Sequence, residues 1–404
     1  MGAPVLAETQ MLDWLAASQP GMERLLSRLV DIDSPSGHDE GLNLVADELA
    51  AFLEQNGVDV RRIPSGSGTP LLQAMTGTRV AGMPVLLMGH MDTVFPRGTV
   101  ARRSYHPKSG RLYGPGVADM KAGLVMNAFV LAGFARFGEG WPIEGLFTVD
   151  EEVASSISRP FIQDAARRAA IVLNAEPGRA NGNVVIERKG GLFLRIGVAG
   201  KPAHSGVDFE GGASAVSELA HKIVALEKLT DIAQGITVNV GLISGGQSVN
   251  TVAPNAEGGL DVRYARNAQR DCLIAQLQGI VDSTTTPGTS STLEVMGEFQ
   301  PMVPDAGARR LFATYRDAAA SLGIKVDAEA TGGCSDAGFT ASLGIPTLCG
   351  VGPVGGGAHT EDEYVERDSL VTRAQALALT ISRHRPTQPE EVAAADQSSL
   401  PDQW

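Results

Sequence analysis

Cysteine is scarce in this chain. Its 404 residues include three cysteines, Cys272, Cys334 and Cys349, which are widely spaced and form no CxxC pair. An odd number of isolated thiols provides neither a disulfide framework nor a thiolate zinc site. The first ten residues also lack the basic stretch and then the apolar stretch of a signal peptide. We therefore expect free thiols in a reducing compartment and a cytoplasmic protein, with a trimmed periplasmic or secreted form as the alternative.

Basic residues and long apolar stretches are also few. Lysine and arginine number 33 against 46 acidic residues, so the net charge is −13. Because nucleic-acid binding needs a basic surface, this balance argues against a nucleic-acid partner. A local basic pocket for an anionic substrate stays compatible with it. No apolar run approaches the roughly 18 residues needed to cross a bilayer, so we expect no membrane partner.

The order of apolar patterns predicts an α/β fold. A hydrophobic content of 43% supports a sizeable core, and the length exceeds that of one ordinary domain. Short apolar runs alternate with segments of helical spacing, which favours a sheet whose parallel strands are covered by helices. The expected strands are 85–88, 146–149, 170–173, 324–328 and 346–350. The expected helices are 9–33, 39–56, 121–137, 158–168, 307–322 and 368–383.

A different pattern interrupts this α/β sequence. Segments 192–198, 236–242 and 260–264 alternate as half-exposed antiparallel strands do, and 212–229 has helical spacing. We therefore predict an inserted α+β domain. The predicted boundaries are 1–188 and 302–386 for the α/β domain, 189–301 for the insertion, and 387–404 for a polar, disordered tail.

Five potential metal ligands follow apolar runs or glycine-rich turns. They are His90, Asp119, Glu152, Glu176 and His359. In α/β sheets ligands collect at the carboxyl ends of strands, so we expect these side chains to converge. Two imidazoles and several carboxylates suit a pair of zinc ions, which can hold and acidify one water between them. Manganese or cobalt would also accept this oxygen-rich set.

Residues next to these ligands suggest further roles. Asp92 lies two positions beyond His90 on an extended segment, where its carboxylate can fix the imidazole tautomer. Glu151 and Glu152 point in different directions, so we expect Glu152 to ligate and Glu151 to act as general base and acid. Asp119 has an alternative role as the cap of the following helix, but its two oxygens can also bridge two cations.

These segments together resemble the two-zinc metallopeptidase and aminoacylase family. The motifs in family order are His-Met-Asp-Thr, Gly-Pro-Gly-Val-Ala-Asp-Met-Lys, Asp-Glu-Glu, Ala-Glu-Pro and Gly-Gly-Ala-His-Thr. The family includes glutamate carboxypeptidase, acetylornithine deacetylase, succinyl-diaminopimelate desuccinylase and bacterial dipeptidases. The resemblance covers about residues 30–382. It implies a mixed-sheet catalytic domain with an inserted lid and dimerisation domain, and hence a homodimer formed through the lid.

The resemblance also implies how the ligands are shared. His90 and Glu176 are expected to bind one zinc ion, and Glu152 and His359 the other. Asp119 is expected to bridge the two ions and to form a cis peptide with the next residue.

In the inserted domain, the resemblance assigns residues to the substrate. His204 matches the lid histidine that steadies the tetrahedral oxyanion, usually across a dimer. Asn250 and Arg263 match positions that hold the substrate carboxylate, and Gly333 lies in a glycine segment that lines the substrate site. Without the resemblance, His204 would be read as a structural loop histidine and Arg263 as a charge on a strand surface.

Two departures bear on specificity. Folate-cleaving glutamate carboxypeptidases look most similar, through His-Met-Asp-Thr-Val and Asp-Val-Arg-Tyr-Ala-Arg. Those relatives carry arginine before the proline that corresponds to Pro301, whereas this chain has Gln300, so the fixed charge for a glutamate carboxylate is missing. The glycine segment also departs from the family at Cys334 and Ser335.

The expected reaction is amide hydrolysis that releases a C-terminal amino acid, with glutamate or aspartate favoured, from a small peptide or an N-acyl amino acid. One alternative within hydrolases is an N-acyl-amino-acid deacylase or a dipeptidase. The alternative from another class is a metal-free binding protein that kept the fold. Loss of Glu151 or of a ligand would mark such a protein, and none of them is missing.

Overall fold

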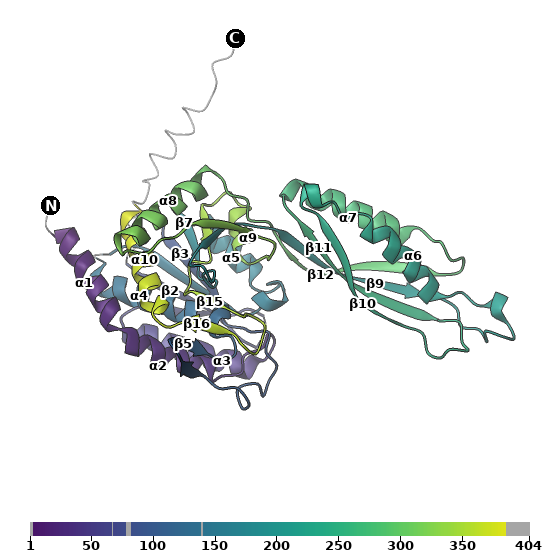
Figure 1. Ribbon diagram of the computed structural model, residues 1–404, viewed down its shortest axis with the longest axis horizontal. Helices are drawn as coiled ribbons and strands as arrows, with labels where there is room; N and C mark the ends of the chain where they lie inside the picture. Colours follow the sequence, from purple (N-terminus) through teal and green to yellow (C-terminus); the bar gives the residue numbers. More distant parts are fainter. Residues whose placement is uncertain (1–2, 67, 78–81, 139, 385–404) are drawn as a thin grey trace, which may run out of the picture. The chain divides into compact units, whose positions relative to one another are not determined.

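The computed structural model describes residues 3–66, 68–77, 82–138 and 140–384 (Figure 1). The chain divides into two compact units. The first takes the chain up to Ile186, then Pro304–Ala330, then the chain from Phe339 onwards. The second takes Glu187–Val303 and Thr331–Gly338. The tail predicted to be disordered, 387–404, lies outside the described residues.

A mixed sheet of eight strands runs through the first unit. The strands are β1 Asp59–Ile63, β2 Leu71–Thr76, β3 Val85–His90, β6 Ile143–Thr148, β7 Ile171–Asn174, β8 Val184–Arg188, β13 Ala328–Thr331 and β14 Thr347–Cys349. Their order is β1-β2-β6-β3-β7-β14-β8-β13. The central strand β3 pairs in parallel with both β6 and β7. The carboxyl ends of these three strands therefore meet at one edge, which is where an α/β sheet collects ligands.

Helices account for most of the remaining first unit. They are α1 Ala3–Ala17, α2 Gln19–Val30, α3 Asp39–Gln55, α4 Ala122–Phe137, α5 Arg159–Arg167, α8 Ala306–Ser321, α9 Ala337–Ala341 and α10 Ser369–Arg383. Helix α4 packs against β2, β3 and β6, and its side chains from Ala122 to Phe134 are buried. A helix that is apolar on all sides belongs in a core, and α4 is the central helix of this one.

The α4 segment corrects one expectation. With the preceding turn it forms a helical stretch, Val117–Phe137, that is long and apolar enough to cross a membrane. The prediction that no run approaches this length was therefore wrong. However, 94% of its most apolar window is buried inside the protein, as expected of a core helix.

A second, smaller sheet joins two distant parts of the first unit. It contains β4 His106–Lys108, β5 Arg111–Tyr113, β15 Gly355–Gly356 and β16 Tyr364–Glu366, in the order β15-β16-β5-β4. Strands β5 and β16 are antiparallel neighbours. This pairing brings the chain just before Asp119 beside the chain just after His359.

The second unit is an α+β structure with its own core. Its antiparallel sheet has the order β10-β11-β9-β12, from β9 Gly190–Ala199, β10 Thr237–Gly245, β11 Asn255–Tyr264 and β12 Ser290–Phe299. Helices α6 Ala215–Glu227 and α7 Asn267–Asp282 pack on this sheet. Alternate residues of β9 and β11 are buried, which is the two-residue period expected of a half-covered sheet.

The α/β class with a mixed sheet is confirmed, and most predicted elements occur within a few residues. Two details were wrong. The segment 9–33 forms two helices that break at Ser18, and the strand predicted at 324–328 runs instead at Ala328–Thr331. Residues 324–327 are irregular, and the side chains of Ile324 and Val326 pack on the core. Elements α7 and β12 were not predicted, because few of their side chains are buried.

Candidate metal centre

Three neighbouring parallel strands deliver most of the candidate ligands. His90 is the last residue of β3, Glu151 and Glu152 follow β6, and Glu176 follows β7. Because β6, β3 and β7 are adjacent, these side chains start from one edge of the sheet. The predicted strand-end arrangement is therefore present in the structure.

Two loops contribute the other ligands. Asp119 lies in a turn, Val117–Lys121, whose backbone is not helical at Asp119 and Met120, and the peptide bond between these two residues is cis, as expected. The helix-cap alternative for Asp119 is wrong, because Lys121 occupies the N-cap position of α4. His359 lies between β15 and β16 with a φ of 64°, a left-handed conformation that is uncommon for a residue with a side chain.

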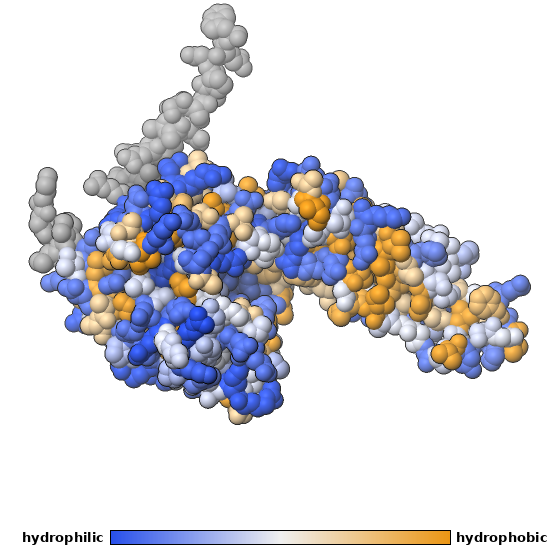
Figure 2. Space-filling view, viewed as in Figure 1, coloured by the Kyte–Doolittle hydropathy of each residue, from blue (hydrophilic) through white to orange (hydrophobic). Residues whose placement is uncertain are grey.

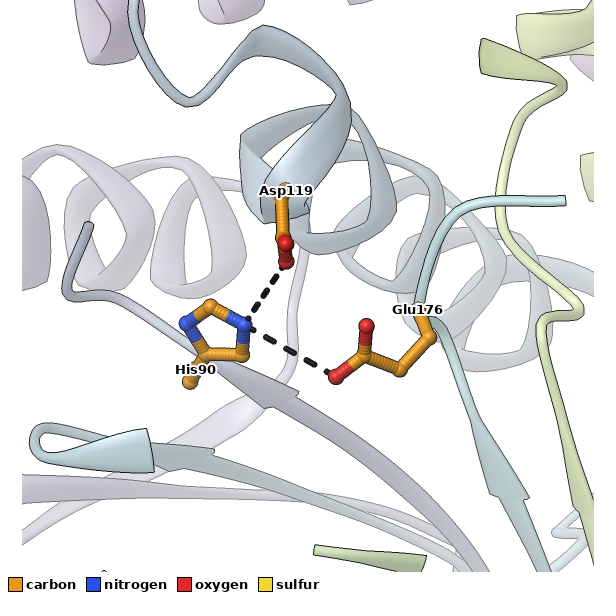
Figure 3. A group of neighbouring side chains, drawn as sticks. All are labelled: His90, Asp119 and Glu176. Carbon is orange, nitrogen blue, oxygen red and sulfur yellow. Dashed lines mark hydrogen bonds and ion pairs between the residues drawn. The ribbon is translucent and has the colours of Figure 1, made fainter. Parts of the chain in front are cut away.

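The five predicted ligands form two triads that share Asp119. In the first, the Nε2 atom of His90 lies 3.1 Å from Asp119 Oδ1 and 3.8 Å from Glu176 Oε1 (Figure 3). In the second, His359 Nε2 lies 3.4 Å from Asp119 Oδ2 and 3.4 Å from Glu152 Oε2. The ligand atoms of each triad lie within 4.8 Å of one another. Asp119 thus offers a different oxygen to each triad, which is the geometry of a bridging carboxylate.

The donor set fits a pair of divalent cations. Each triad combines one imidazole nitrogen with two carboxylate oxygens, which are ligands that zinc accepts. Glu152 Oε1 is also buried and has no hydrogen-bond partner among the described residues. A buried carboxylate oxygen without a partner is costly, and coordination to a cation would remove that cost.

The same crowding shifts the pKa values of the ligands. Burial lowers the pKa of His90, but hydrogen bonds to Asp119 and Asp92 more than offset it, so the pKa lies well above its usual value. Hydrogen bonds to Asp119 and Glu152 raise the pKa of His359 to about 10. Burial opposes ionisation of Asp119, yet the two imidazoles hold its pKa far below its usual range. In the metal-free protein, protons on the imidazoles therefore supply the positive charge.

Metal binding should consequently release protons. A pKa of about 10 keeps His359 protonated at neutral pH in the metal-free protein, and only a neutral imidazole can ligate a metal. The affinity for zinc should therefore rise as the pH increases from 6 to 9. Calorimetric titration with zinc in buffers of different ionisation enthalpy measures the protons released. An affinity that is constant over this range would contradict the pKa shifts.

Asp92 connects the first triad to the turn after β6. The Nδ1 atom of His90 lies 3.0 Å from the Asp92 backbone oxygen and 3.3 Å from its Oδ1 atom. The Asp92 carboxylate also accepts the backbone N–H groups of Glu151 at 3.2 Å and Glu152 at 3.1 Å, and the Ser36 hydroxyl at 2.6 Å. One fully buried carboxylate thus fixes both the ring of His90 and the backbone that carries the two glutamates.

Glu151 lies beside the triads. Its side chain is 8% exposed, and its negative charge raises the pKa of His90. The neighbouring Glu152 contributes an atom to the second triad, whereas Glu151 belongs to neither triad. This difference in position is compatible with the expected roles, in which Glu152 is a ligand and Glu151 is the general base.

Glu363 is a buried residue beside the site that the sequence reading missed. Its carboxylate is fully buried and accepts three backbone N–H groups, from Gly116 at 2.8 Å, Ala118 at 2.8 Å and Asp119 at 2.9 Å. Burial raises the pKa of Glu363 to about 7, although these three donors pull it downward. The carboxylate therefore fixes the turn from which Asp119 reaches both triads. In the sequence, Glu363 is the third acidic residue of Thr-Glu-Asp-Glu. The pattern does not distinguish it from Glu361 and Asp362, which are exposed in the structure.

Replacing Glu363 should weaken metal binding without removing a ligand. In Glu363→Gln the amide NH₂ must face a backbone N–H group, because the carboxylate accepts such groups with both of its oxygens. Loss of an outer partner of a metal ligand typically costs about 10–100-fold in metal affinity. Competition with a chromogenic chelator measures this affinity, and Glu361→Gln, an exposed neighbour, is the control. Equal affinities of Glu363→Gln and wild type would show that the turn does not need this carboxylate.

The second unit holds the four other candidate residues. His204 and Asn250 lie on adjacent segments, since Ser205 donates its backbone N–H to the Asn250 carbonyl at 3.0 Å. The Nδ1 atom of His204 accepts the Gly206 N–H at 3.1 Å, so the neutral ring carries its proton on Nε2. Arg263 donates to both oxygens of Asp261 at 2.6 Å and contacts the thiol of Cys334, next to Gly333. Its guanidinium is therefore already paired, which was not predicted although the two residues share a strand face.

Comparisons with known proteins identify relatives of this chain. The model of peptidase family M20/M25/M40 matches residues 86–383. Carboxypeptidase G2 of Pseudomonas sp. (strain RS-16) is 29% identical over 374 residues, which cover 90% of this chain and 89% of that protein. Acetylornithine deacetylase of Proteus mirabilis (strain HI4320) is 29% identical over 231 residues, which cover 53% of this chain and 58% of that protein.

A solved structure shows the same fold. The dinuclear metal-binding M20 peptidase of Bacillus subtilis superposes with a TM-score of 0.63 at 16% identity, covering 91% of this chain and 98% of that one. The family match extends from β3, which ends in His90, to the end of α10 and includes all five candidate ligands. The chain therefore belongs to peptidase family M20/M25/M40 and is a metallopeptidase, a hydrolase that acts on amide bonds.

Proposed function

We propose that this protein is a two-zinc carboxypeptidase that releases a C-terminal acidic residue, glutamate or aspartate, from a short peptide or an N-acyl amino acid. The observation that carries the hydrolytic part is the pair of triads that share Asp119, with the buried Glu151 beside them. Zinc is proposed because each triad offers one imidazole and two carboxylates, with cobalt or manganese as alternatives.

In this proposal, His90 and Glu176 hold one cation, Glu152 and His359 hold the other, and Asp119 bridges them. When bound, the cations acidify a water molecule and polarise the scissile carbonyl. Glu151 accepts a proton from the attacking water and then donates it to the nitrogen of the departing amino acid. Asp92 keeps the backbone of Glu151 in place while this proton moves, through the hydrogen bond to the Glu151 N–H.

The second unit is proposed to act as the lid. His204 is suited to donate a hydrogen bond to the oxyanion, because its Nδ1 atom already accepts a backbone N–H and leaves Nε2–H as the donor. Such a donor typically contributes about 3–4 kcal/mol to transition-state stabilisation. Asn250 and Arg263 are proposed to hold the substrate carboxylate, with Gly333 lining the site. For Arg263 this requires the substrate carboxylate to compete with Asp261.

The carboxypeptidase part of the proposal is supported by the similarity to carboxypeptidase G2 over 90% of the chain. The preference for acidic residues rests on the cationic side chain of Arg263, which can attract a carboxylate. The pairing of Arg263 with Asp261 favours the second candidate, an N-acyl-amino-acid deacylase, because a neutralised guanidinium attracts an acidic side chain less strongly. The similarity to acetylornithine deacetylase is consistent with that candidate.

A substrate panel tests the proposal. The zinc-loaded enzyme is assayed on N-acyl amino acids and dipeptides that end in glutamate, aspartate, alanine or phenylalanine, with chelated enzyme as the control. The proposal expects the highest kcat/KM for the acidic C-termini. Equal or higher kcat/KM for N-acetyl-alanine would establish the deacylase instead. No zinc-dependent hydrolysis of any member would refute both candidates.

A homodimer through the second unit is part of the proposal. Strand β10 is an edge strand, and its Leu242 and Ile243 side chains are 74% and 64% exposed. With Leu194 and Met296 they line a hollow of about 450 Å³. Figure 2 shows hydrophobic residues gathered where Figure 1 draws this sheet. An open edge beside exposed apolar side chains favours pairing with a second copy.

The dimer is tested by placing charges on this strand. We expect wild type to have about twice the mass of the 42.2 kDa chain at micromolar concentration. The double variant Leu242→Asp with Ile243→Asp should be a monomer, because two carboxylates would have to be buried in the interface. Light scattering after gel filtration measures the mass, with Val249→Asp, also exposed in this unit, as the control. A monomeric wild type would end this part of the proposal.

A further inference from the structure

We propose that a hollow beside the His359 loop is a binding site for an anionic group, a carboxylate or a phosphate. The hollow has a volume of about 700 Å³ and lies entirely within the first unit. Arg102, Arg103 and Lys108 line it. None of the metal ligands does, so the hollow is distinct from the two triads.

Two carboxylates hold the backbone of the loop that carries Arg102 and Arg103. The Asp33 carboxylate accepts the N–H groups of Gly98 at 2.6 Å and Val100 at 2.9 Å. Asp31 accepts the N–H group of Tyr105 at 2.7 Å. The cationic side chains therefore start from an ordered backbone, which reduces the entropy lost when a ligand binds.

Arg103 presents an unused pair of donors. Its Nη1 atom donates to the Thr360 carbonyl at 2.8 Å, and its guanidinium lies over the Phe95 ring, 4.5 Å from the centroid. Its Nε and Nη2 atoms are buried and have no hydrogen-bond partner among the described residues. No other described side chain leaves two such atoms unpartnered. These two N–H groups form the side of a guanidinium that binds two oxygens of a carboxylate or phosphate.

The charge around Arg103 favours an anion. Arg102 and Lys108 have no carboxylate within 4 Å in the part of the chain that the structure describes, and neither does Arg103. Glu361 and Asp362 also line the hollow, so three cations face two carboxylates. The hollow is thus locally positive on a chain whose net charge is −13. Buried donors without acceptors call for a bound group, and an anion matches both the donors and the charge.

The position of the hollow relates it to catalysis. Thr360, which accepts the Arg103 hydrogen bond, follows His359 directly, so an occupant lies beside a loop that carries a metal ligand. The anionic group belongs either to the acyl part of a substrate or to a separate small anion. The first source rests on the proposed amide hydrolysis, whereas anion binding itself does not.

Calorimetric titration of the zinc-loaded protein with inorganic phosphate tests binding directly. Wild type is compared with Arg103→Met and with Arg97→Met, a control on the same loop whose side chain is exposed and does not line the hollow. Phosphate that binds at the metal centre is common to all three proteins. Wild type and Arg97→Met should bind one phosphate more than Arg103→Met, or bind it at least about tenfold more tightly. Indistinguishable titrations of Arg103→Met and wild type would overturn the proposal.

Two further comparisons complete the test. If Arg103→Met does not fold, the double variant Arg102→Met with Lys108→Met, whose side chains are exposed, takes its place with the same expected result.

N-glutaryl and N-pentanoyl derivatives of one amino acid differ in a terminal carboxylate. A rise in KM confined to the glutaryl substrate identifies the substrate as the source, and equal KM values with altered phosphate binding identify a separate anion. Absence of hydrolysis would refute the proposed function and leave the phosphate result standing.

Discussion

Glu151→Gln is expected to lower kcat by a factor on the order of 10²–10⁴ while the protein keeps both metal ions, because the variant loses proton transfer and no ligand. Glu151 belongs to neither triad, and its backbone N–H donates to the Asp92 carboxylate. The amide has nearly the same shape as the carboxylate but cannot accept the proton. Steady-state kinetics and metal analysis of the same preparation measure the two quantities.

The control for this experiment separates a base from a ligand. Glu152→Gln replaces the adjacent glutamate, which contributes an oxygen to the second triad. It should lower both kcat and the metal content, whereas Glu40→Gln, on the exposed surface, should change neither. Normal turnover in Glu151→Gln, or loss of metal from it, would refute the assigned role.

Asp119→Ala should have the largest effect on metal binding. Asp119 gives one oxygen to each triad, so its removal leaves each triad with two residues. Both ions should be lost at micromolar concentrations, and activity should fall by more than the 10–100-fold that is typical of outer-shell variants. Mass spectrometry of the metals in dialysed protein measures the stoichiometry.

A matched comparison shows whether Asp119 bridges the two ions. Glu176→Ala removes a ligand from the first triad only and leaves the second complete. It should therefore retain one ion, whereas Asp119→Ala retains neither. If both variants lose the same single ion, Asp119 serves one triad and the bridging role is wrong. Circular dichroism controls for loss of the fold.

The candidate ligands were predictable because each follows either an apolar run or a glycine-rich turn. His90 and Glu176 follow the apolar segments of β3 and β7, and Asp119 follows a glycine-rich turn. Parallel strands place such residues at one edge of the sheet without any knowledge of the remaining fold. The residue type then selects the chemistry, since imidazole and carboxylate are metal ligands.

The partners of these ligands were not predictable in the same way. Glu363 acts on Asp119 only because β5 and β16 pair, and that pairing joins segments about 250 residues apart. The donors left free on Arg103 depend on Thr360 and Phe95, which the sequence does not place together. In contrast, Asp261 and Arg263 are two positions apart on one strand. Because side chains at positions i and i+2 of a strand point to the same face, their ion pair could have been predicted from the sequence.

Some helices and strands were also predictable from the sequence, and others were not. Helix α4 was predicted because it is apolar and fully buried, and its position was correct within one residue. Helix α7 was missed because it buries Leu273, Leu277 and Val281 among polar residues, so its stability comes from packing on the sheet. Burial alone did not make an element predictable, because strand β2 was also missed although Leu71, Leu72 and Ala74 are fully buried.

A crystal structure of the zinc-soaked protein, with anomalous scattering recorded at the zinc absorption edge, tests the central claim most directly. We predict two anomalous peaks, one coordinated by His90 and Glu176 and the other by Glu152 and His359, each with one oxygen of Asp119. A single peak, or peaks that do not touch Asp119, would contradict the two-metal centre and the hydrolytic mechanism built on it.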